Sequence, residues 1–112
     1  MSYQFQVGQV FTSPAVKAEL TDGQLIAVLR QHVSGEWDSD IREANEQAVL
    51  NGSQIFSKCR LRGKKRQQLT IWILTDECRT KTLVMFPRDS AYRASDLGEV
   101  PGPLLHRGLI FP

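Results

Sequence analysis

Three stretches with a strand-like pattern follow one another in the middle of the chain. They span residues 54–62, 68–75 and 80–86, and turn-forming residues separate them. The central stretch carries the run Leu69–Leu74, which is rich in β-branched and aromatic residues, as strands typically are. Because the links are short, consecutive strands are expected to pair antiparallel. Alternation of apolar and polar residues indicates a fourth, optional strand over residues 3–7.

The central strand is apolar on both of its faces. Ile71 and Ile73 point to one side, and Trp72 and Leu74 point to the other. A strand of this kind is usually covered on both faces. We therefore expect helices over one face of the sheet, and either the C-terminal tail or a second copy of the protein over the other.

Helical spacing of apolar residues predicts two or three helices, over residues 14–20, 22–33 and 39–51. Ser13 before Pro14 is typical of a helix start. Gly35 and Gly52 follow the last two helices, where a left-handed residue commonly ends the element. We expect Asp38 or Ser39 to cap the third helix. The prediction is an α+β fold, with the helices on one face of a three- to four-stranded antiparallel sheet.

The chain of 112 residues is long enough for one domain, which we place at residues 1–90. Residues 91–112 show no periodicity and contain several glycines and prolines, so we interpret them as an irregular tail. Apolar residues between Leu104 and Phe111 indicate that this tail docks on the domain or on a neighbouring chain.

Composition adds little to the fold but limits the function. The formal net charge is +2, and hydrophobic residues make up 41% of the chain, as in ordinary globular proteins. Cys59 and Cys78 have no metal-ligand spacing and are expected to be reduced thiols. There is no signal-peptide pattern and no apolar run long enough for a membrane span. We expect a cytoplasmic protein without a membrane association, a metal or another cofactor.

Charge is concentrated in the turn between the first two strands of the sheet. Six cations fall within nine residues: Lys58, Arg60, Arg62, Lys64, Lys65 and Arg66. The first three alternate, so they share one strand face with Phe56 and form a coherent basic patch. Such a hairpin can bind nucleic-acid phosphates, or it can simply protect a strand from aggregation. The low net charge makes nucleic acid the less favoured partner.

An acidic helix precedes this hairpin. Its residues Asp40, Glu43 and Glu46 could lie across from Arg60 and Arg62, either within one chain or between two chains. Exposed pairs of this kind contribute about 0–1 kcal/mol each. We favour this interpretation over paired catalytic carboxylates.

The remaining candidates carry little chemistry. His32 is expected at the C-terminal end of the second helix, where a cation interacts well with the helix dipole, and His106 lies in the tail. No nucleophile motif surrounds either cysteine, so we predict no catalytic residues. Trp37 is either a core residue or a binding hot spot. Asp76 opens the second turn, where an aspartate commonly hydrogen-bonds along the backbone.

Four segments resemble a family of small bacterial proteins of unknown function, carried by plasmids and other mobile elements; some members are labelled restriction-modification subunits. The segments are residues 32–37, 44–48 with Gly52, 71–76, and 79–87. The resemblance covers about residues 5–89, and the tail lies outside it. This chain departs from the family pattern at Asp38, Thr80 and Ser90. The resemblance implies mobile-element cargo and carries no known activity or catalytic residues.

The sequence favours a non-enzymatic accessory protein of a mobile element that acts through protein–protein contacts as a homodimer. The alternative is a nucleic-acid-binding module that uses the basic hairpin.

Overall fold

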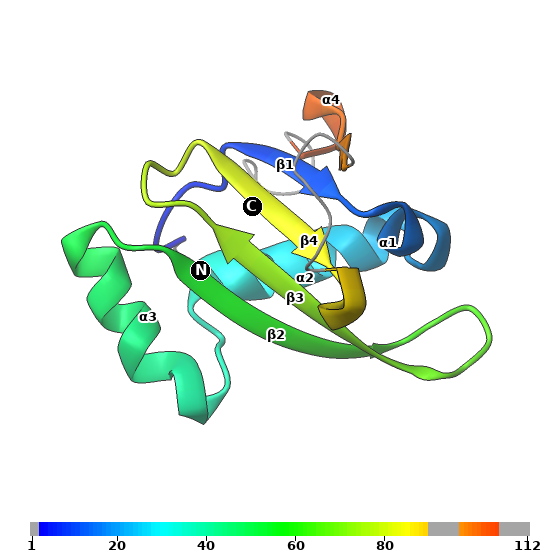
Figure 1. Cartoon of the computed structure of the whole chain (residues 1–112), viewed down its shortest axis with the longest axis horizontal. Coiled ribbons are helices and arrows are strands. Elements are labelled where there is room, and N and C mark those ends of the chain that lie inside the picture. The colour runs from blue at the N-terminus through cyan, green and yellow to red at the C-terminus, as the bar shows by residue number, and fades with distance from the viewer. Residues whose placement is uncertain (1–2, 90–96, 106–112) are drawn as a thin grey trace.

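A five-stranded mixed sheet forms the centre of the computed structural model, which describes residues 3–89 and 97–105 (Figure 1). The strands are β1 (Gln9–Thr12), β2 (Ile55–Arg62), β3 (Gln68–Thr75), β4 (Lys81–Met85) and β5 (Gly98–Glu99). The helices are α1 (Pro14–Glu19), α2 (Asp22–Ser34), α3 (Ser39–Asn51) and α4 (Gly102–Leu105), and η1 (Pro87–Asp89) is a 3₁₀ turn. The α+β prediction is confirmed.

The strand order is β2-β3-β4-β1-β5. The three predicted strands pair antiparallel through short turns, as expected. The prediction of a purely antiparallel sheet with three or four strands is wrong, because β1 pairs parallel with β4 and β5 adds a fifth strand. Three helices separate β1 from β2, so no tight turn constrains the direction of β1, and it can join the sheet in parallel beside the last central strand.

The predicted N-terminal strand at residues 3–7 is also wrong, since the strand begins at Gln9. The alternation of Tyr3–Val7 instead describes an extended segment whose Gln4 amide donates to the carbonyl of Val33, 2.6 Å away. Gly8 then redirects the chain with φ 65°, and a Cβ there would lie 2.3 Å from the backbone of Thr80. Only glycine allows this approach, so the strand starts directly after it.

The three long helices lie within one residue of their predicted bounds. Thr21 forms a complete capping box at the start of α2, and the side chain of Ser13 caps α1. Gly35 and Gly52 end α2 and α3 in the left-handed conformation. Asp38 occupies the N-cap position of α3, but its side chain makes no capping hydrogen bond. Local sequence signals therefore decide where these helices begin and end.

Helices α1 and α2 cover one face of the sheet, whereas α3 lies beside the edge strand β2 (Figure 1). Ile71 and Ile73 are fully buried in the main core under α2. A smaller cluster under α3 contains Trp37, Ala48 and Ile55. The expectation that all helices share one face holds for α1 and α2 only, because α3 packs against the margin of the sheet.

The described part of the C-terminal region contributes to the main core. Leu97, Val100 and Leu105 are buried, and β5 pairs with β1. The sequence pattern indicated no regular element here, but the structure contains both β5 and α4. Both elements are short and contain glycine or proline, so they produce no periodic pattern in the sequence.

Candidate functional site

The face of the sheet opposite α2 carries an apolar row that crosses four strands. Phe56, Leu74, Leu83 and Phe11 occupy consecutive register positions on β2, β3, β4 and β1. Each is partly exposed, and none belongs to either core cluster. We call these four residues the apolar row. Figure 1 shows this face turned toward the viewer, with α2 behind the sheet.

Trp72 extends the apolar row on the same face. It lies opposite Lys58 on β2 and Met85 on β4. Its ring meets that of Phe56 edge to face, with centroids 5.4 Å apart. The sequence pattern predicts a cover over this face as well, but the structure leaves Trp72 partly exposed. This open face therefore presents an aromatic-rich surface suited to contact with another apolar surface.

Both margins of the sheet are protected against strand pairing. Asn45 on α3 is buried, donates to the carbonyl of Phe56 at 2.6 Å and accepts from its amide at 3.3 Å. Gln24 donates to the carbonyl of Arg62 at 2.9 Å. At the other margin, β5 is only two residues long. Because exposed strand edges are the usual route of edge-to-edge association, the open face is the better candidate surface.

The first two basic residues of β2 are neutralised within the chain. Lys58 contacts Asp40 at 2.7 Å, and Arg60 lies 3.9 Å from Asp38. The hydrogen bond from Lys58 holds the pKa of Asp40 below its usual range. The predicted pairing of α3 with the hairpin is thus present, but through Asp38 and Asp40. Within residues 3–89 and 97–105, no ion pair joins Glu43 or Glu46 to the hairpin.

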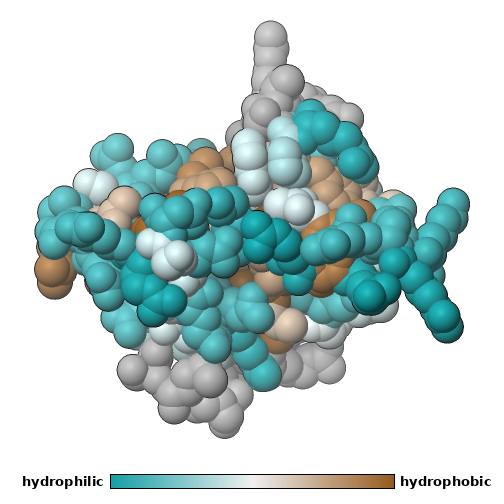
Figure 2. Space-filling view, turned by 90° about the horizontal axis from the view of Figure 1, so that it is seen from below, coloured by the Kyte–Doolittle hydropathy of each residue, from teal (hydrophilic) through white to brown (hydrophobic). Residues whose placement is uncertain are grey.

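The other cations lie at the tip of the β2–β3 hairpin. Arg62, Lys64, Lys65 and Arg66 are all exposed, and no ion pair joins them to an acid within residues 3–89 and 97–105. We call these four residues the basic tip. Figure 2 shows hydrophilic side chains projecting at the right, where Figure 1 places this hairpin. The six predicted cations are therefore divided into a neutralised pair and an uncompensated tip.

Trp37 belongs to the smaller core cluster under α3. Its side chain is 5% exposed, and its Nε1 donates to the carbonyl of His32 at 2.9 Å. Of the two predicted roles, the structure places Trp37 in the core.

His32 lies inside the protein in a chain of hydroxyl groups. Its Nδ1 is 2.5 Å from the Ser57 hydroxyl, and its Nε2 is 2.8 Å from the Thr75 hydroxyl. Thr75 is in turn 2.7 Å from the hydroxyl of Thr82, which donates to the carbonyl of Val7 at 2.8 Å. Each hydroxyl has one proton. Thr75 therefore donates to Thr82, Nε2 donates to Thr75, and Nδ1 accepts from Ser57.

The expectation that His32 acts as a cation at the helix end is wrong. Burial, assisted by the positive charge of Arg79, lowers the pKa of His32 to about 3. The ring is thus neutral at ordinary pH, and at 1% exposure it is not accessible to a substrate. Its contacts join α2, the sheet and the N-terminal segment.

The cysteines and the second turn are also explained by local structure. Cys59 and Cys78 are free, and burial raises the pKa of the half-buried Cys59 thiol. Asp76 accepts from the amide and the hydroxyl of Thr80 at 2.8 and 2.6 Å, which is the turn role predicted for it. Arg79 in the same turn donates to the backbone carbonyls of Ser53 and Ala48.

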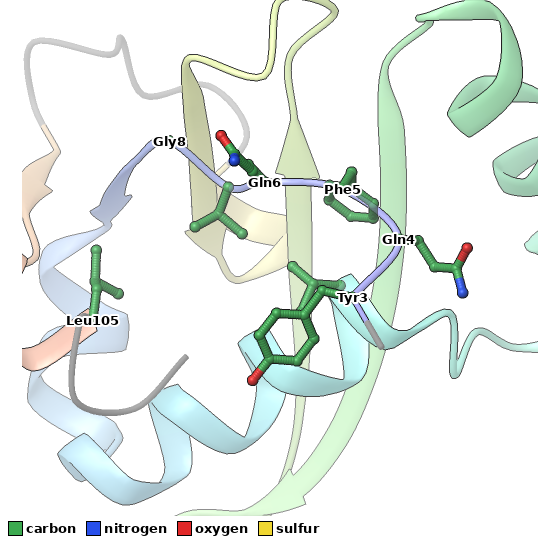
Figure 3. A pocket seen from close by; sticks show the side chains of 8 residues that line it. Tyr3, Gln4, Phe5, Gln6, Gly8 and Leu105 are labelled. Carbon is green, nitrogen blue, oxygen red and sulfur yellow. The ribbon is translucent and has the colours of Figure 1, made fainter. Parts of the chain in front are cut away.

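A cavity of about 610 Å³ lies between the N-terminal segment and α4, with Tyr3 and Leu105 on opposite sides (Figure 3). Its lining is apolar or carries uncharged polar groups, and consists of Tyr3, Gln4, Phe5, Gln6, Val7, Gly8, Val33 and Leu105. His32 is not among these lining residues.

Among the described residues, no group of three or more His, Cys, Asp or Glu side chains is placed to hold a metal ion. In the same part of the chain, no helix has the length and apolar character needed to cross a membrane. Comparison with protein-family models, curated proteins and solved structures found no match to the chain.

Sequence reasoning missed part of the open face. Phe11 and Leu83 were not singled out, because neither lies in a pattern that reveals its neighbours across the sheet. Side chains alternate between the two faces along strand 80–86, and this alternation was sufficient to place Leu83 on the other face from the buried Val84. Nothing local could place Phe11 beside it, since the parallel pairing of β1 and β4 joins residues far apart in the chain.

Proposed function

We propose that this chain is a non-enzymatic accessory protein that acts through protein–protein contacts, and that its first partner is a second copy of itself. The observation that carries the proposal is the apolar row on a sheet face that no long helix covers within the described residues. Protected sheet margins direct association to this face.

The order of residues in the apolar row favours a symmetric partner. Across the sheet it reads Phe56, Leu74, Leu83, Phe11, which has the same residue types in both directions. A two-fold axis parallel to the strands, between β3 and β4, would place each Leu74 over the partner's Leu83. Isologous interfaces need exactly this self-complementarity, and two sheets pack face to face in this manner about 10 Å apart.

Association with a mobile genetic element rests on the family resemblance alone. The absence of catalysis is supported by the burial of His32 and by the neutral lining of the cavity.

The proposal is tested by solution mass. A dimer has twice the monomer mass of 12.7 kDa, and dilution should reveal its dissociation in light scattering or sedimentation. The double variant Leu74→Thr/Leu83→Thr removes apolar contact but retains strand-forming residues. We expect it to weaken the dimer at least tenfold, because two partly exposed leucines lose most of their apolar area.

Leu50→Thr is the matched control. Leu50 is an exposed leucine, at 80%, on α3 away from the open face. This variant should retain the parent's dissociation constant. A monomeric parent at high concentration would refute self-association, and a dimer sensitive only to Leu50→Thr would place the interface on α3. Circular dichroism establishes that each variant is folded.

A further inference from the structure

The basic tip concentrates positive charge, although the net charge of the whole chain is small. The chain as a whole has a net charge of +2. Asp40 and Asp38 neutralise Lys58 and Arg60 lower on the same strand. The four cations of the tip, Arg62, Lys64, Lys65 and Arg66, have no such partner within the described residues. The charge therefore extends from the body on one hairpin, where an anionic partner can approach it.

Hydrogen bonds hold the turn in one conformation. The Gly63 amide donates to the carbonyl of Gln67 at 2.9 Å, and the Arg66 amide donates to the carbonyl of Gly63 at 3.0 Å. The Lys65 amide donates to the side chain of Gln67 at 3.0 Å. Arg66 has a φ of 63°, which closes the turn. A turn so closely bonded loses little conformational entropy when a ligand binds.

The base of the hairpin is fixed to the helical layer. Gln67 donates to Glu19 of α1 at 3.2 Å, and Gln24 of α2 donates to the carbonyl of Arg62 at 2.9 Å. Two independent helices thus support the strands below the tip. The cations are presented on a rigid two-stranded ribbon instead of a mobile loop.

The chemistry of the tip favours a nucleic-acid duplex over a single strand. Residues 62–68 contain no aromatic side chain on which a base could stack, and stacking is the main source of single-strand affinity. Cations without aromatic neighbours contact phosphates. The major groove of B-form DNA is about 12 Å wide and admits a two-stranded ribbon. The major groove of A-form RNA is too narrow for one.

We infer that the β2–β3 hairpin binds double-stranded DNA through its phosphates, with Arg62, Lys64, Lys65 and Arg66 as the contacting residues. This inference goes beyond the proposed self-association and does not depend on it, because the tip lies outside the apolar row. Phosphate contacts alone carry no sequence information. Binding is therefore independent of sequence and depends strongly on salt.

The test measures anisotropy of a fluorescent DNA duplex at several salt concentrations with the full-length protein. Four phosphate contacts predict a slope of log K against log salt of about −3.6, at about 0.9 per contact. The variant Lys64→Gln/Lys65→Gln should lower the magnitude of the slope by about 1.8 and weaken binding roughly tenfold or more at low salt. Arg66 is left unchanged, because its φ is 63° and a substitution there would test backbone conformation together with charge.

Lys17→Gln/Lys81→Gln removes the same charge from α1 and β4 and is the matched control. It should retain the slope of the parent protein. Equal loss in both double variants, no duplex binding at low salt, or binding of a single-stranded oligonucleotide alone would each overturn the inference. The solution mass of the same samples is measured separately. A monomer that binds duplex DNA would refute self-association and support DNA binding by the hairpin. A dimer that binds no duplex DNA would support self-association and refute DNA binding by the hairpin.

Discussion

At the scale of single residues, the most constrained group is the imidazole of His32. It links hydroxyl groups on β2 and β3, and Thr82 extends the chain to the carbonyl of Val7. Every proton in this chain has a defined acceptor, so the neutral ring is fully satisfied where it is buried. A protonated ring would need to donate from Nδ1 as well, and Ser57 would then have to turn its own proton away.

This arrangement predicts acid sensitivity. The folded pKa of His32, about 3, lies below its ordinary value of 6.5. Between these values the unfolded chain binds a proton that the folded protein does not. The stabilising contribution is therefore present above pH 6.5 and is lost as the pH falls toward 3. Urea unfolding should show the free energy of unfolding falling by up to about 1.4 kcal/mol per pH unit from His32.

The range between pH 6.5 and 5 separates His32 from most carboxylates. His32→Gln should lower stability at pH 7.5 but remove most of the pH dependence in this range. His106→Gln, which alters the other histidine of the chain, is the control and should retain the dependence. A wild-type stability that does not change between pH 7.5 and 5 would contradict the interpretation.

At the scale of elements, the edge strand β2 depends on a side chain from a neighbouring helix. Asn45 replaces a strand partner by bonding both the amide and the carbonyl of Phe56. This contact fixes α3 at the margin of the sheet and closes part of the edge to other chains. It also explains why α3 lies beside β2 and not over the sheet face.

Asn45→Ala should destabilise the protein by about 1–3 kcal/mol, because it leaves two backbone groups of Phe56 without their partner. Chemical denaturation measures this loss. Gln47→Ala changes an exposed amide on the same helix and is expected to alter stability by less than about 0.5 kcal/mol. Equal effects of the two substitutions would show that the Asn45 contacts do not stabilise the edge.

The elements also show which features were readable from the sequence. The helices were placed closely because Ser13, Thr21 and the glycines after α2 and α3 act within a few residues. The antiparallel order of β2, β3 and β4 was predictable from short links. The N-terminal strand was misplaced because an extended segment packed on α2 alternates in the same way as a strand.

At the scale of the whole molecule, an early and a late segment of the described chain meet in the sheet. β1 lies between β4 and β5, and Leu105 reaches the main core. The fold is therefore closed by contacts between the first and last described segments. We expect unfolding in a single transition that includes α4.

Leu105→Ala should destabilise the whole domain by about 2–5 kcal/mol, as for other buried leucines. Leu50→Ala removes the same atoms from a site that is 80% exposed and should have almost no effect. Thermal unfolding followed by far-ultraviolet circular dichroism measures both. A Leu105→Ala protein with wild-type stability would show that α4 is not part of the cooperative unit.

The sequence by itself determined the helices, the central hairpins, the two-sided apolar character of β3 and the position of the basic tip. These features arise from interactions between residues close in the chain, and a short window contains the information. Only the tertiary structure decided that β1 inserts in parallel beside β4, that Phe11 completes the apolar row, and that His32 is buried and neutral. Each of these depends on residues distant in sequence meeting in one place, and free energy gained by burial between distant segments leaves no local pattern to read.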